Sequence, residues 1–121
     1  MNATAETFDE LPQFDLERVT ELKLLRNGAL FAALAKGYEE QGEREIAAIR
    51  QAIGAAEFER GAVIAHSLKS SSLNIGAQIM GAIARRLEGD LYEGRTDALE
   101  KLCDELDENF RKALLELRTL A

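Results

Sequence analysis

The sequence predicts an all-α fold, an antiparallel up-and-down four-helix bundle with a short extra N-terminal helix. The chain of 121 residues has one proline and few aromatic residues, and it is rich in Ala, Leu, Glu and Arg, which favour helix. Apolar residues recur at steps of three and four over four long stretches. Glycines follow most of these stretches, and short glycine turns suit antiparallel neighbours in a bundle.

The start of the chain is polar and acidic, and we expect residues 1–14 to form a flexible N-terminal segment ahead of a helical domain over 15–121. Phe8, Leu11 and Phe14 are its larger apolar residues. They are candidates to fold back onto the body, and the two phenylalanines could also support a dimer.

A short first helix is expected after Asp15, which is a good N-cap residue. Leu16, Val19 and Leu22 share one face of this helix. The dipeptide Asn27-Gly28 is a strong turn signal and should end it.

Four long amphipathic helices follow. Their expected ranges are 29–53, 57–74, 77–91 and a last helix that begins at about residue 97. Gly37 and Gly42 weaken the first of the four and mark a bend or a close packing point. The last of the four has the cleanest apolar stripe, which includes Cys103 as a core residue.

The composition excludes several classes of function. The formal net charge of −7 and the lack of a basic patch argue against nucleic-acid binding and against anionic membrane surfaces. The lone Cys103 cannot form an intramolecular disulfide. No stretch is long and apolar enough to span a bilayer, and the N-terminus does not resemble a signal peptide. We therefore expect a cytoplasmic protein and, by default, a monomer.

His66 is the only histidine of the chain, and helical phase places it on the solvent side. At about 100° per residue it points roughly 140° away from the centre of the apolar face of its helix. Ala62, Ser70 and Leu73 lie on the same side, and Lys69 lies at its flank, one turn away. An exposed large apolar residue beside a histidine is typical of a docking surface, although Leu73 could equally be an edge of the core.

An exposed imidazole near neutral pH is often unprotonated and can act as a nucleophile. Lys69 could offset the negative charge of a phosphoryl group placed on the ring. The small side chains of Ala62 and Ser70 would leave room for a partner to approach.

The stretch from Ala65 to Ala77, AHSLKSSSLNIGA, resembles the signature of histidine-containing phosphotransfer (HPt) domains. That signature is Ala-His-x-Leu-Lys-Gly, then small residues, then an apolar residue and a glycine. The resemblance extends to the flanking helices. It implies that His66 accepts a phosphoryl group from a receiver-domain aspartate and passes it to another receiver domain. It further implies that Lys69 is the cation near the phosphate and that Gly76 is the turn after the active helix.

One position departs from the HPt pattern, because Ser70 stands where the family usually has glycine. Serine is small, so approach of a receiver should be preserved, and its hydroxyl could hydrogen-bond the phosphoryl oxygens. We therefore take Lys69 and Ser70 as phosphate-proximal residues. The candidate partner-docking residues are Ala62, Leu73 and Gly76.

Enzymatic functions are disfavoured. One histidine and one cysteine cannot assemble a usual zinc site, and the chain lacks a glycine-rich phosphate loop. In sensor-kinase dimerisation domains the histidine is usually followed by an acidic residue, where this chain has Ser67. We therefore expect a phosphocarrier without autonomous kinase activity and without a cofactor of its own, with Mg²⁺ carried by the partner receiver.

A helical adaptor without phosphoryl chemistry is the alternative function. It would bind receivers or other signalling proteins through the same motif. For Arg85 and Arg86 on the neighbouring helix, the sequence favours solvated charge or pairing with Glu88 and Asp90 along that helix over a phosphate site.

Overall fold

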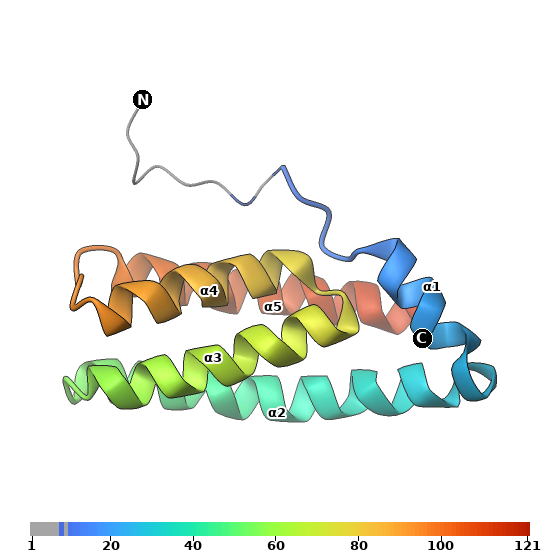
Figure 1. Ribbon diagram of the computed structural model, residues 1–121, viewed down its shortest axis with the longest axis horizontal. Coiled ribbons are helices and arrows are strands. Elements are labelled where there is room, and N and C mark those ends of the chain that lie inside the picture. Colours follow the sequence, from blue (N-terminus) through green and yellow to red (C-terminus); the bar gives the residue numbers. More distant parts are fainter. Residues whose placement is uncertain (1–7, 9) are drawn as a thin grey trace.

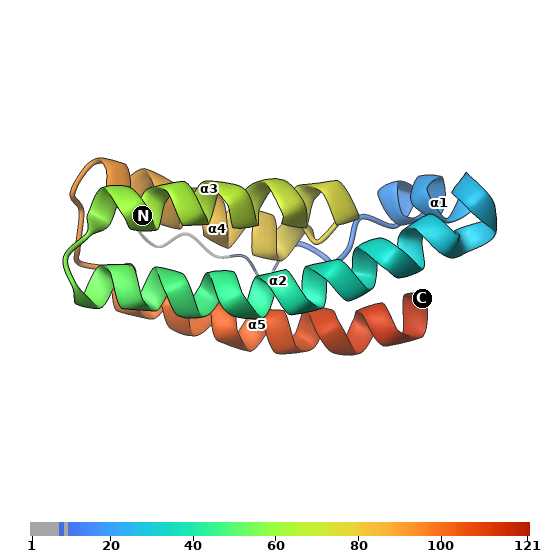
Figure 2. The same cartoon turned by 90° about the horizontal axis from the view of Figure 1, so that it is seen from below.

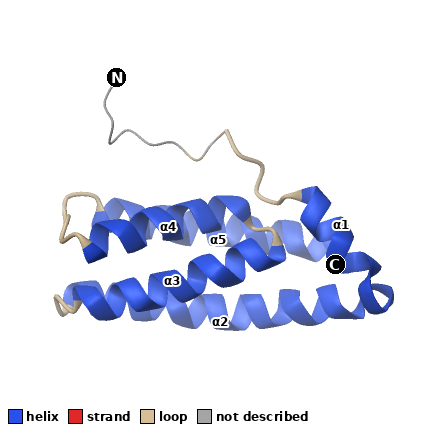
Figure 3. Cartoon of the chain, in the orientation of Figure 1, coloured by secondary structure: helices blue, strands red, loops and turns tan. Residues whose placement is uncertain are grey.

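The computed structural model of the protein describes residues 8 and 10–121, and over these residues it is helical (Figures 1 and 3). The elements are α1 (Leu16–Leu24), a 3₁₀ turn η1 (Leu25–Gly28), α2 (Ala29–Gly54), α3 (Phe58–Ile75), α4 (Gln78–Tyr92) and α5 (Leu99–Leu120). The described residues contain no strand, only an isolated bridge between Phe14 and Ala77.

Helices α2 to α5 run alternately in opposite directions and pack side by side as a four-helix bundle (Figures 1 and 2). Short α1 lies across one end, near the C-terminus of the chain, where Lys23 Nζ donates to the carbonyl oxygen of Leu120 at 2.7 Å. The predicted fold class is confirmed. Among the helices of the described part of the chain, none has the apolar length needed to cross a membrane.

Local sequence signals explain some of the helix ends. The side chain of Asp15 caps α1 by accepting from the backbone N–H groups of Glu17 and Arg18. At the predicted Asn27-Gly28 turn, Asn27 and Gly28 adopt φ values of 54° and 86°. The last helix begins at Leu99, two residues later than expected, because Thr96 to Ala98 still belong to the turn.

The core lies between the four long helices and is built from their apolar stripes. Cys103, Leu106 and Phe110 of α5 are buried, as predicted for its clean stripe. Gly42 is the close packing point, because a Cβ atom there would lie 2.6 Å from Phe110 Cε1. The hydroxyl groups of Tyr38 and Ser72 share a buried hydrogen bond of 2.7 Å that joins α2 to α3.

The described part of the N-terminal segment packs against the bundle. Phe8 and Phe14 are buried, as their apolar character indicated, whereas Leu11 is 41% exposed. The backbone N–H of Asp15 donates to the carbonyl oxygen of Gly76 at 2.8 Å, which fixes the segment beside the end of α3. Residues 1–7 and 9 lie outside the described residues, so the flexibility expected for them stays a prediction.

Candidate functional site

His66 lies in the middle of α3 with its side chain 58% exposed, and this confirms the orientation predicted from helical phase. Its helix neighbours Ala65 and Leu68 are fully buried at 0% exposure. These residues hold α3 against the rest of the bundle. The histidine is therefore presented by a helix whose other side is part of the core.

Glu88 of α4 connects the two motif residues of α3. Its Oε2 lies 2.8 Å from Nδ1 of His66, and its Oε1 accepts a hydrogen bond of 2.8 Å from Nζ of Lys69. The side chains of Glu88 and Lys69 are 14% and 22% exposed. One carboxylate thus holds the imidazole and the ammonium group side by side.

The charge of Glu88 is maintained by these partners. Burial by itself would raise the pKa of this carboxyl group. The hydrogen bonds from Lys69 and His66 and the positive charge of Lys69 oppose that effect, and the pKa of Glu88 is lowered from its usual 4.5. Glu88 is therefore ionised at neutral pH and can act only as a hydrogen-bond acceptor.

The contact with Glu88 fixes the tautomer of the neutral ring. Because a carboxylate only accepts, Nδ1 of His66 must carry the proton of the 2.8 Å hydrogen bond. Nε2 of the neutral imidazole is then left with a free electron pair. In catalytic triads, a carboxylate bound to one ring nitrogen orients the histidine so that its other nitrogen reacts. By the same arrangement, Nε2 is the nucleophilic atom of the exposed His66 ring.

The part of the chain that carries His66, Lys69 and Glu88 matches a known protein family. The family model described as Hpt domain matches residues 33–119, which include all of α3 and α4 and the three clustered side chains. The chain belongs to the Hpt domain family. As an Hpt domain it has a histidine phosphotransfer role in phosphorelay, and the family interacts with receiver domains of two-component proteins.

A solved structure supports the fold of this Hpt domain. The chain is similar to the crystal structure of histidine-containing phosphotransfer protein B (HptB) from Pseudomonas aeruginosa PAO1, with a TM-score of 0.84 and 18% sequence identity. The similarity covers 89% of this chain and 93% of the other. A comparison with curated protein sequences finds no match.

Two of the expected docking residues of the Hpt domain are buried. Ala62 has 0% exposure, so its predicted place on the surface beside His66 is wrong. Helix α3 packs on both α2 and α4, and its buried face is therefore wider than its apolar stripe. Gly76 does end α3, with φ of 90°, but it is buried beneath Asp15 and Arg18 of the N-terminal region.

Leu73 and Ser70 are on the surface of α3, as expected. Leu73 is 52% exposed and lies over Gly81 of α4, where a Cβ atom would come within 2.6 Å of Leu73 Cδ2. Ser70 is exposed on the same helix, one turn from His66. Among the residues predicted to form the surface around His66, Ser70 and Leu73 are therefore exposed and available for contact with a partner.

The two arginines of α4, Arg85 and Arg86, differ in their contacts. Arg86 Nε lies 3.2 Å from Oδ1 of Asp90, which is the pairing along the helix that the sequence indicated. Asp90 is 1% exposed, and Arg95 Nε also donates to it, at 2.9 Å. Arg85 is exposed and forms no ion pair or side-chain hydrogen bond with the residues that the structure describes. Glu88, which the sequence had offered as a local partner, pairs across to α3 instead.

The part of the chain that the structure describes holds no group of three or more His, Cys, Asp or Glu side chains placed to bind a metal ion. Cys103 is buried, and burial raises the pKa of its thiol, which suits its predicted role in the core.

Proposed function

We propose that this Hpt domain is a phosphorelay intermediate in which His66 accepts a phosphoryl group from a receiver-domain aspartate and passes it to a second receiver. The observation that supports this most is the hydrogen bond between Nδ1 of His66 and Glu88, on a ring that is 58% exposed. In the neutral ring this bond leaves Nε2 with a free electron pair on an exposed side chain, which is what a phosphoryl acceptor needs.

The proposed step requires no proton transfer. The lone pair of His66 Nε2 attacks the phosphorus, the bond from phosphorus to the aspartyl oxygen breaks, and the receiver regains its carboxylate. Positive charge develops on the imidazole as the new bond forms. Glu88, hydrogen-bonded to Nδ1–H at 2.8 Å, stabilises that charge. The return step runs through the same contacts with a second receiver.

Lys69 and Ser70 take supporting roles in this proposal. The amine of Lys69 is held at 2.8 Å from Glu88, on the carboxylate that also binds His66, and it adds positive charge near the incoming phosphoryl group. Ser70 offers a small, exposed hydroxyl group one turn from the histidine. The receiver supplies the Mg²⁺ that its aspartyl phosphate chemistry requires.

The chain is proposed to act only as a carrier. An autonomous kinase would need a site for ATP, and the sequence offers no glycine-rich phosphate loop to hold one. We therefore expect no labelling when the protein is incubated with ATP and Mg²⁺ alone. Labelling should require a phosphorylated receiver.

Incubation with a phosphorylated receiver tests the proposal and separates it from a purely adaptor function. Acid-labile label should appear on the wild-type protein and not on His66→Gln. Binding of the receiver without transfer to either form would support the adaptor function and overturn the phosphorelay proposal. Ser67→Ala is the matched control on the same helix and should accept label as the wild type does.

A further inference from the structure

The charges around His66 indicate that a phosphoryl group placed there is stabilised by a cation other than Lys69. The ammonium group of Lys69 is already paired with Glu88 at 2.8 Å, so together they carry no net charge. A phosphoryl group brings about two negative charges at neutral pH. The single positive charge that the imidazole gains on phosphorylation offsets only part of this, so a phosphoryl group on His66 favours a further cation beyond the Lys69–Glu88 pair.

The register between α3 and α4 places Arg85 next to this pair. Glu88 faces His66 and Lys69, while Gly81 faces Leu73, so the two helices run antiparallel along this face. Arg85 lies between Gly81 and Glu88 on α4, one turn from each. It is therefore level with the part of α3 that carries Lys69.

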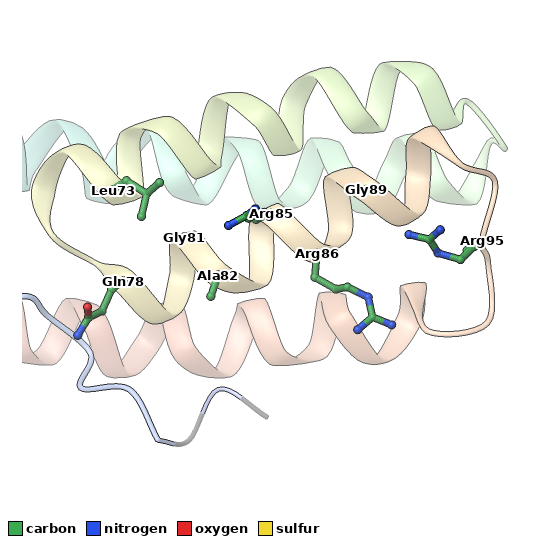
Figure 4. A pocket seen from close by; sticks show the side chains of 8 residues that line it. All are labelled: Leu73, Gln78, Gly81, Ala82, Arg85, Arg86, Gly89 and Arg95. Atoms are coloured by element: carbon green, nitrogen blue, oxygen red, sulfur yellow. The ribbon is translucent and has the colours of Figure 1, made fainter. Parts of the chain in front are cut away.

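Arg85 lines a groove of about 430 Å³ along α4, together with Leu73 of α3 (Figure 4). Two other arginines line the same groove, but Arg86 and Arg95 both donate to the buried Asp90. In Figure 4 the charged end of Arg85 lies apart from theirs. Among the described residues of this groove, Arg85 is thus the arginine whose charge no carboxylate offsets.

We propose that Arg85 binds the phosphoryl group on His66 and is the second cation of the site. This inference rests on the proposed function. The guanidinium group would donate to the phosphoryl oxygens both as the bond from phosphorus to Nε2 forms and in the phosphohistidine product. Arginine suits this task because its planar donors match the geometry of phosphate oxygens.

Phosphoramidate, a small phosphoryl donor, tests this role without a receiver. The lone pair of His66 Nε2 attacks phosphorus, the bond from phosphorus to nitrogen in the donor breaks, and ammonia leaves after protonation by water. Arg85→Gln should lower the rate of phosphohistidine formation about tenfold. Arg85→Lys should recover part of that loss. Arg111→Gln, an exposed arginine on α5, is the matched control and should react as the wild type does.

A second measurement reports on contact with the phosphoryl group. In ³¹P NMR titrations of the phosphorylated protein, a nearby cation favours the dianion. The phosphoryl protonation step should therefore move to higher pH in Arg85→Gln and stay in place in Arg111→Gln. Equal rates and equal titrations for Arg85→Gln and the wild type would overturn the proposal.

The outcomes also separate this inference from the relay function. An Arg85→Gln variant that reacts normally with phosphoramidate, and needs only a higher receiver concentration for normal transfer, would make Arg85 a docking residue and overturn the proposal. If the wild type reacts with phosphoramidate but takes nothing from any phosphorylated receiver, the relay function fails. The measured role of Arg85 at the phosphoryl group would then still stand.

Discussion

At the scale of single residues, the account depends on which ring nitrogen of His66 carries the proton. The chain has one histidine, so its imidazole nitrogens can be observed by NMR without signals from others. The hydrogen bond of 2.8 Å to Glu88 requires the Nδ1–H tautomer. Free imidazole side chains in water favour Nε2–H, so the two states are distinguishable.

Replacing Glu88 by leucine should therefore shift the neutral ring toward the Nε2–H tautomer, as read from ¹⁵N chemical shifts. The rate of phosphoryl transfer should fall about ten- to a hundredfold, because Nε2 then carries a proton in most of the population and the positive charge that develops on the ring loses its carboxylate partner. Glu43→Leu, at an exposed position of α2, is the control and should change neither quantity. A wild-type protein in the Nε2–H tautomer would contradict this role of Glu88.

The lowered pKa of Glu88 also predicts how stability depends on pH. A carboxyl group with a lower pKa in the folded state binds fewer protons there than in the unfolded chain. Its contribution is complete above the unfolded value of about 4.5 and is lost as the pH falls through the folded value. The difference in unfolding free energy between the wild type and Glu88→Gln should thus shrink below about pH 4.5. Chemical denaturation at a series of pH values measures it, and a constant difference down to pH 2 would contradict it.

The sequence revealed His66 and Lys69 but not Glu88, and the reason is physical. Helical phase decides whether a residue faces solvent, and it needs only the position within one helix. The partner of a residue on another helix depends on register, which is set by packing such as that of Leu73 over Gly81. No local pattern encodes that register.

At the scale of the helices, the two inner glycines of α2 have different environments. A Cβ atom at Gly42 would lie 2.6 Å from Phe110 Cε1, whereas at Gly37 it would meet nothing within 4 Å. The sequence marked both as weak points of the helix. Only the packing of α2 against α5 shows that the close contact requires glycine at position 42 and not at position 37.

Gly42→Ala should therefore lower the free energy of unfolding by about 1–3 kcal/mol, because the overpacked Phe110 ring must move. Gly37→Ala on the same helix should raise it by about 0.5–1 kcal/mol, because alanine favours helix and meets no neighbour. Urea denaturation of both variants makes the comparison. Equal effects of the same sign would show that helix propensity, rather than packing, decides both positions.

Sequence periodicity also could not predict the width of the buried face of α3. Helix α3 packs on both α2 and α4, and small residues such as Ala62 are buried there at positions that periodicity assigns to solvent. Apolar stripes predict the centre of a buried face well. Its edges depend on how near the neighbouring helices come, and this is why the surface around His66 is narrower than expected.

At the scale of the whole molecule, the N-terminal segment closes one end of the bundle. Phe14 is 1% exposed and its backbone forms a bridge with Ala77, just after the end of α3. The bundle itself could be predicted because four amphipathic stretches and their glycine turns determine it. The apolar side chains of Phe8 and Phe14 indicated that the segment contacts the bundle, but the place where it docks could not be predicted, because it depends on single aromatic contacts without a periodic signal.

Phe14→Ala should lower the free energy of unfolding by about 3–5 kcal/mol, the usual cost of removing a buried aromatic ring. Leu11→Ala in the same segment should cost far less, because Leu11 is 41% exposed. Thermal or chemical unfolding checks both. A Phe14→Ala variant as stable as Leu11→Ala would show that the segment is not part of the cooperative fold.

The central claim is that His66 takes a phosphoryl group at Nε2 while Nδ1 stays hydrogen-bonded to Glu88. The most direct measurement uses protein labelled with ¹⁵N in histidine, treated with a phosphorylated receiver and observed by ¹⁵N and ³¹P NMR. We predict one phosphohistidine, with phosphorus coupled to Nε2, and none in His66→Gln. Phosphorus coupled to Nδ1, or a phosphorylated product that persists in His66→Gln, would contradict the account.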